Sequence, residues 1–247
     1  MKELFGQAQH LFYKVSIYYS IIAFLLVLVG FGVKDFGLAK IFWQVLPPLF
    51  ATILFGLLFD YLETKKWQVS LGPVVSGLII GLVGQFGERA WVLFLIGFVA
   101  MGIKFLVKLY GRNVFNPAAS GLFLGLILFS SHPAWWGGER YPWIFYLWIP
   151  GLLFKLKRWA PMVGFLAPSA LFGGLNILTS GSMLFFSSVM LIEPMTSPVK
   201  MKSGLIYGMV VAFGYLVFSK FILLDPLIIS LLFGNILGRV LNRRLKT

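Results

Sequence analysis

The chain has 247 residues, of which 59% are hydrophobic and 12% are charged, and its mean hydropathy is +0.91. This composition excludes an ordinary soluble domain and is typical of a membrane protein. Because the chain contains no cysteine, it cannot form disulfides, supply a cysteine nucleophile or bind an iron–sulfur cluster through thiolates of its own.

Apolar runs occupy almost the whole chain and predict ten transmembrane helices. In chain order we expect them at residues 15–33, 41–62, 70–86, 89–108, 115–131, 143–155, 159–179, 181–197, 203–220 and 224–240. The first run is too long for the core of a signal peptide. The chain divides into two halves of five helices, 1–142 and 143–247, and an odd number per half inverts the second relative to the first. The predicted fold is an all-α polytopic membrane protein with two inverted five-helix repeats and broken helices at its centre.

The net charge of +13 is distributed unevenly over the predicted topology. An even number of helices puts both termini on one side, and that side carries sixteen of the 21 Lys and Arg residues. Cytoplasmic loops carry the excess of basic residues, so we expect a multi-pass protein of the cell membrane with both termini in the cytoplasm. This uneven distribution argues against a nucleic-acid partner, and it favours anionic membrane lipid at the inner face.

Two predicted elements in each half are interrupted. The fifth elements open on Asn116 and Asp225, each followed by a proline, and the third elements, 70–86 and 181–197, are short and rich in glycine or proline. Proline frees a backbone carbonyl that lipid cannot satisfy, so such breaks belong where lipid is excluded. Matched breaks in two halves predict a binding site near the midplane, where the third and fifth elements meet. The alternative is that Gly and Pro are simply common in membrane helices.

Small residues recur at helical spacing in these interrupted elements. They let helix backbones approach closely, and little else holds helices together in lipid. We therefore expect close helix packing around the predicted site from the glycines Gly77, Gly81, Gly84, Gly121, Gly125, Gly234 and Gly238.

Two acidic residues stand out as candidates for a functional role. Six of the eight acidic residues fall in predicted loops or at the ends of helices, whereas Glu193 and Asp225 each precede a proline and adjoin an apolar segment. A carboxylate there is costly unless it faces a cavity, a partner or a cation. Each of the two carboxylates is interpreted either as a binding site for a transported Na⁺ or proton, or as a helix cap. The residues expected to line or cap the cavity are Asn116, Pro117, Ser120, Glu193, Thr196 and Asp225.

No catalytic motif accompanies these residues. The sequence contains no phosphate-binding glycine loop, no nucleotide fingerprint and no arrangement typical of a hydrolase. Its two histidines, His10 and His132, are far apart in the sequence, so we expect no metal site. The chain is therefore predicted to hold no catalytic residues of its own.

Two blocks resemble those of a known family. A glycine-rich third helix, a basic turn and the run Asn113-Val114-Phe115-Asn116-Pro117-Ala118 resemble its "NxFNPA" block, and the stretch 183–208 resembles its "FFMATDPVTSP" block, with Glu193 in place of aspartate. The family is RnfD/NqrB, a membrane subunit shared by the Rnf electron transport complex and the sodium-translocating NADH:quinone reductase. The resemblance implies ten helices in two inverted repeats, similar to urea transporters. It also implies a role in coupling electron transfer to Na⁺ or H⁺ movement, with partner subunits that carry flavin and iron–sulfur clusters. In such a complex the chain would be at most a non-catalytic or flavin-carrying subunit of a membrane oxidoreductase.

The chain departs from this family where a cofactor would be attached. Members carry flavin mononucleotide on a threonine of an "SGAT" motif in the outer loop after the fifth helix, whereas residues 130–143 of this chain contain no threonine. The threonines lie elsewhere: Thr52, Thr64, Thr179, Thr196 and Thr247. We therefore expect no covalent flavin, and any bound FMN or riboflavin would be non-covalent. The missing threonine also favours a second hypothesis, a stand-alone channel or transporter for a small solute or ion on the urea-transporter-like fold.

Overall fold

A computed structural model describes residues 17–68, 70–109, 112–156, 158–198, 200–221 and 224–244. In the first half the elements are α2 (Ile17–Phe36), α3 (Leu38–Thr64), α4 (Leu71–Val83), α5 (Ala90–Leu106), the short antiparallel pair β1 (Lys108–Leu109) and β2 (Arg112–Asn113), α6 (Pro117–Phe129) and the short α7 (Trp136–Glu139). In the second half they are α8 (Trp143–Leu156), α9 (Trp159–Gly173), η1 (Leu175–Thr179), α10 (Gly181–Phe185), η2 (Phe186–Met190), α11 (Met201–Phe221) and α12 (Pro226–Arg244).

A helix lies at each of the ten predicted positions, with differences at the ends. The seventh element is cut short because Gly174 takes a left-handed φ of 104°, and η1 follows it. The eighth runs as α-helix only to Phe185 and then widens into a π-helical turn, in which the Leu191 N–H donates to the Phe186 carbonyl over 2.9 Å. The chain leaves helical structure after Met190, so Glu193 lies in a turn. The predicted cytoplasmic termini lie outside the described residues.

The described part of the chain is an all-α membrane protein. Among the described helices, α2, α3 and α11 are long and apolar enough to cross a membrane, and the remaining apolar helices are shorter. The outer face of α3 exposes large apolar side chains, including Trp43, Phe50 and Leu54. In water these side chains would be costly, whereas in lipid they lie in their preferred surroundings.

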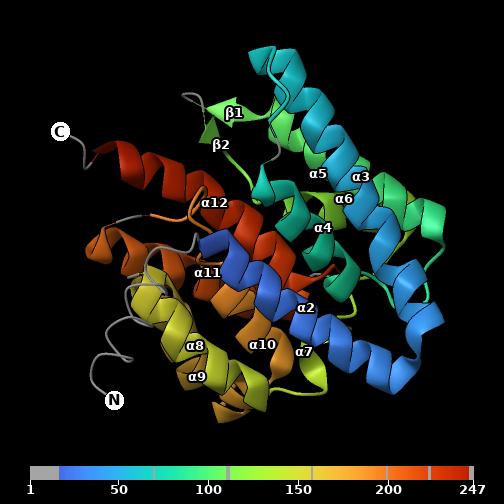
Figure 1. Cartoon of the computed structure of the whole chain (residues 1–247). Helices are drawn as coiled ribbons and strands as arrows, with labels where there is room; N and C mark the ends of the chain where they lie inside the picture. Colours follow the sequence, from blue (N-terminus) through green and yellow to red (C-terminus); the bar gives the residue numbers. More distant parts are fainter. Residues whose placement is uncertain are drawn as a thin grey trace, which may run out of the picture.

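Helix packing follows a similar pattern in the two halves. In the first half α3 lies against α4 and α5, and α5 lies against α6; in the second, α9 lies against α11, and α11 against α12. In the view of Figure 1, α3 to α6 occupy the upper right and α8 to α11 the lower left. The two halves meet where α6 packs against α12. This contact brings together the two helices that begin after a proline break.

Small residues make these close contacts possible. A Cβ on Gly121 of α6 would lie 2.8 Å from the Ile96 carbonyl oxygen of α5, as the glycine spacing predicts, and one on Gly97 of α5 would lie 2.9 Å from the Pro48 carbonyl oxygen of α3. Distances this short leave no room for a side chain. The backbones of neighbouring helices therefore touch directly.

Candidate functional site

The two proline breaks are helix N-caps of the same design. The Asn116 Oδ1 accepts a hydrogen bond from the Ala119 N–H at 3.0 Å, and the Asp225 Oδ1 accepts one from the Ile228 N–H at 2.9 Å. Each cap is followed by a proline in the first helical position, where the missing N–H would have had no helical partner. The sequence thus starts α6 and α12 at these residues at little cost in backbone hydrogen bonds.

The second polar atom of each cap connects it to the end of another broken element, directly for Asn116 and through Trp135 for Asp225. The Asn116 Nδ2 donates to the Met190 carbonyl at the end of η2, at 3.4 Å. The Asp225 Oδ2 accepts from the Trp135 indole N–H at 2.8 Å, and the Trp135 backbone N–H donates to the Val83 carbonyl at the end of α4, at 3.2 Å. The fifth element of each half is therefore tied to the third element of the other half.

Glu193 lies in a tight turn held by neighbouring hydroxyls. The Thr196 hydroxyl donates to the Glu193 Oε2 at 3.0 Å, and the Ser197 hydroxyl donates to the Glu193 carbonyl at 2.8 Å. These bonds fix the carboxylate relative to the turn backbone.

Two arginines fix the same turn from outside. The Arg158 Nη1 donates to the Ser197 Oγ at 2.8 Å, and the Arg239 Nη2 donates to the Met195 carbonyl at 2.8 Å. Burial lowers the pKa of the Arg158 guanidinium, although arginine keeps its charge in proteins because its ordinary value is so high. Positive charge from two separate segments thus lies close to the Glu193 turn.

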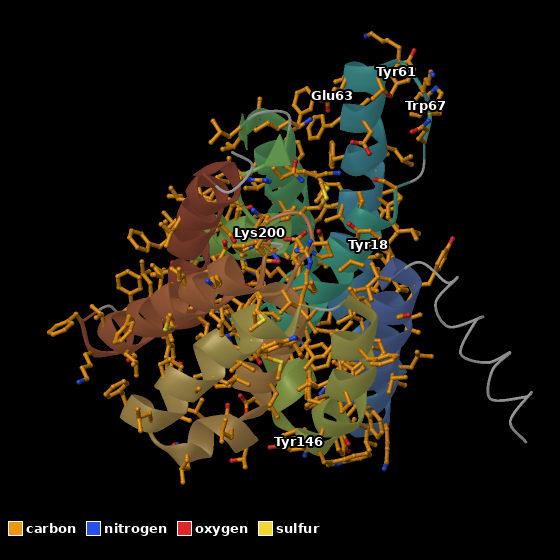
Figure 2. The ribbon with its side chains drawn as sticks, turned by 90° about the vertical axis from the view of Figure 1, so that its left-hand side faces the viewer. Tyr18, Tyr61, Glu63, Trp67, Tyr146 and Lys200 are labelled. Atoms are coloured by element: carbon orange, nitrogen blue, oxygen red, sulfur yellow. The ribbon has the colours of Figure 1, made fainter. Side chains whose placement is uncertain are left out.

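A cavity of about 200 Å³ opens beside Glu193. Its walls come from Tyr18 of α2, the start of α4 at residues 70–72 with Ser76, Lys104 of α5, Asn113 of β2, Pro117 of α6, and Glu193 with Met195. A smaller space of about 20 Å³ shares Tyr18, Gly72, Ser76 and Glu193 with it and adds Asn116. Figure 2 shows Tyr18 at a middle level, between the end that carries Tyr61 and Trp67 and the end that carries Tyr146. The cavity therefore lies at a middle level of the molecule rather than at either end.

The cavity suits a small charged or polar species. Among its lining residues Lys104 and Glu193 carry charges, and the hydroxyls and amides of Tyr18, Ser70 and Asn113 add uncharged polar groups. Glu193 is partly buried and faces this space. The starts of α4 and α6 also open onto it, and helix starts carry partial positive charge. The Glu193 carboxylate therefore faces a space onto which the Lys104 ammonium and the partial positive charge of two helix starts also open.

The structure brings some of the sequence-predicted residues together and separates others. Asn116, Pro117 and Glu193 line the cavity or the smaller space beside it. Thr196 does not line either space but donates a hydrogen bond to the Glu193 carboxylate. Ser120 donates to the Pro117 carbonyl at 2.9 Å and lines a different, apolar groove of about 360 Å³ beside α6 and α12. Asp225 lies apart from the cavity, bonded to Trp135.

Several lining residues were not singled out from the sequence. Lys104 entered the prediction only as one of the basic residues that set the topology, and Tyr18 belonged to an apolar run. The sequence feature that could have pointed to Lys104 is its position in the last turn of an apolar helix, just before a basic turn. Within the described residues, no group of three or more His, Cys, Asp or Glu side chains could hold a metal ion.

A comparison of the chain with protein-family models finds no match, and a comparison with curated proteins finds none either.

Proposed function

We propose that the chain is an integral membrane subunit of an ion-translocating electron transport complex, of the RnfD/NqrB kind found in the Rnf complex and in the sodium-translocating NADH:quinone reductase. Na⁺ or H⁺ passes through the cavity beside Glu193. The observation that carries this proposal is a carboxylate that faces a cavity at a middle level of a membrane protein, with Lys104 in the same cavity wall. A carboxylate inside a membrane costs free energy unless it binds a cation or a proton.

The finer fold belongs to this proposal. Ten membrane-spanning helices form two inverted repeats, residues 1–142 and 143–247, with both termini in the cytoplasm. Support comes from the matched pairing of α3, α5 and α6 with α9, α11 and α12, and from the two N-caps of like design. The excess of basic residues on one side supports the orientation.

Electron transfer requires partner subunits. The chain has no cysteine for iron–sulfur clusters and no nucleotide-binding motif. The partners therefore supply the clusters and the site of reductant oxidation, and this chain supplies the cation path. Any FMN or riboflavin held by the chain is non-covalent, because residues 130–143 contain no threonine.

The proposal is tested by Glu193→Gln in the native host. Glutamine keeps the shape and the bond from Thr196 but removes the charge. We expect everted membrane vesicles to lose most of the respiration-driven cation uptake while the amount and melting temperature of the protein stay normal. The matched control is Glu139→Gln, which changes a carboxylate that accepts from the Ser182 N–H and does not line the cavity. Normal uptake by Glu193→Gln would refute the proposal.

The alternative function is a stand-alone channel or transporter for a small solute or ion. The missing flavin threonine favours it, and the polar cavity would also suit a small solute. The two functions differ in their need for partners. If the purified chain alone, reconstituted in liposomes, conducts Na⁺ or a small neutral solute such as urea without any redox partner, the alternative is correct.

A further inference from the structure

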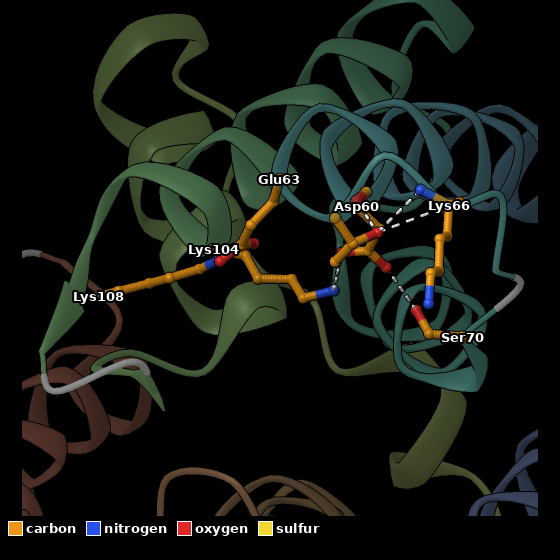
Figure 3. Close-up of polar contacts among 7 residues, drawn as sticks. Asp60, Glu63, Lys66, Ser70, Lys104 and Lys108 are labelled. Carbon is orange, nitrogen blue, oxygen red and sulfur yellow. Dashed lines mark hydrogen bonds and ion pairs between the residues drawn. The ribbon is translucent and has the colours of Figure 1, made fainter.

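A cluster of ion pairs joins the ends of α3 and α5 next to the cavity. Figure 3 shows Lys104 and Lys108 reaching from the α5 side toward Asp60 and Glu63 of α3. The Lys104 Nζ lies 3.7 Å from the Asp60 Oδ1, Lys108 pairs with Glu63, and the Ser70 hydroxyl donates to the Asp60 Oδ2 at 3.0 Å. The two ion pairs thus lie side by side, about one helical turn apart.

Lys104 differs from Lys108 in what it faces on its other side. Both lysines line a small space of about 10 Å³ together with Asp60, but Lys104 also lines the cavity that contains Glu193. Lys104 therefore stands between two carboxylates, Asp60 toward the end of α3 and Glu193 in the interior.

The other charged or titratable groups near Glu193 are held in place. Arg158 and Arg239 bond to the turn at Ser197 and Met195, and the Tyr207 hydroxyl donates to the Asn235 Oδ1 at 2.9 Å. Tyr18 of α2 also faces the cavity but carries no positive charge. Of these three cations, Lys104 is the one that combines a place in the cavity wall with a long flexible stem that can swing between partners.

We propose that Lys104 is a tethered cation that alternates between Asp60 and Glu193. This inference rests on the proposed function of Glu193 as a cation station. When the transported cation leaves, the Lys104 ammonium moves to Glu193, so the carboxylate is never left bare in the membrane interior. When a cation arrives, Lys104 returns to Asp60, the position seen in this structure. Asp60 is thus a positioning residue, and it sets how strongly Lys104 competes for Glu193.

Carbodiimide labelling of Glu193 tests this competition in the purified full chain. Dicyclohexylcarbodiimide adds to a protonated carboxyl in an apolar site, and mass spectrometry of the Glu193 peptide at one fixed pH measures the extent. Lys104→Met removes the competing ammonium, so labelling should rise at least fivefold. Asp60→Asn keeps an acceptor for Ser70 but releases Lys104 toward Glu193, so labelling should fall at least threefold. The double variant should label like Lys104→Met, because Asp60 acts only through Lys104.

The matched controls are Lys108→Met and Glu63→Gln. They break the neighbouring ion pair without changing a residue that lines the Glu193 cavity, so labelling should stay within twofold of the parent. Equal labelling in the parent, Lys104→Met and Asp60→Asn, including no labelling in any of them, would overturn the role of Lys104. If Glu193→Gln also abolishes cation uptake in that case, only the inference about Lys104 fails, whereas normal uptake by Glu193→Gln removes the proposed function itself.

Discussion

Replacing Asp225 by alanine should destabilise the protein more than replacing Asn116, although both residues cap a helix after the same kind of break. Asp225 caps α12 through its Oδ1 and accepts from the Trp135 indole through its Oδ2 at 2.8 Å. Loss of an N-cap costs about 1 kcal/mol. Trp135 is only 6% exposed, so its orphaned N–H adds about 1–3 kcal/mol. We expect Asp225→Ala to lower the free energy of unfolding by roughly 2–4 kcal/mol.

Asn116→Ala removes an equivalent cap but a weaker second bond. The Asn116 Nδ2 lies 3.4 Å from the Met190 carbonyl oxygen, near the limit of a hydrogen bond, and it involves no charged group. The expected loss is therefore about 1–2 kcal/mol, mainly from the cap. The difference between the two variants reflects the short, charge-assisted bond to Trp135.

Reversible unfolding by sodium dodecyl sulfate in mixed micelles, followed by circular dichroism, measures both values. A double-mutant cycle of Asp225→Ala with Trp135→Phe isolates the bond between the two residues, and we expect a coupling of about 1–3 kcal/mol. A coupling near zero would refute this reasoning. So would an Asn116→Ala variant as unstable as Asp225→Ala.

Three other predictions concern packing, topology and the cofactor. Gly97→Ala should lower the free energy of unfolding by about 1–3 kcal/mol in the same assay, because the new Cβ would meet Pro48 of α3. Gly102→Ala on the same helix should be neutral, because nothing lies within 4 Å of its Cβ position. Equal effects of the two changes would contradict the close contact of α3 with α5. In intact cells an impermeant maleimide should label Arg140→Cys but not Trp67→Cys, and labelling of both would exclude the proposed orientation. Acid precipitation should release any flavin into the supernatant, and colour that stays with the pellet, with Thr179 the first residue to examine, would show that the flavin is covalent.

The sequence by itself determined the positions of the helices and their main breaks. Lipid cannot pair with backbone groups, so each apolar run has to satisfy its own hydrogen bonds as a helix, and a polar residue before proline has to start a new one. Asn116 and Asp225 were therefore recognisable as helix starts without any tertiary information. The spacing of Gly121 and Gly125 likewise indicated close packing, and both glycines lie against Ile96 of α5.

Only the tertiary structure decided which of these breaks share a site. Glu193 and Asp225 look alike in the sequence, yet one faces the cavity and the other bonds to Trp135, 90 positions away. Lys104 and Tyr18 line the same cavity as Glu193 from helices far from it in the sequence. The residue pattern of one segment shows whether that segment is stable as a helix in lipid. A cavity, in contrast, is formed by several segments that packing brings together, and the pattern within one segment does not show which others it will meet.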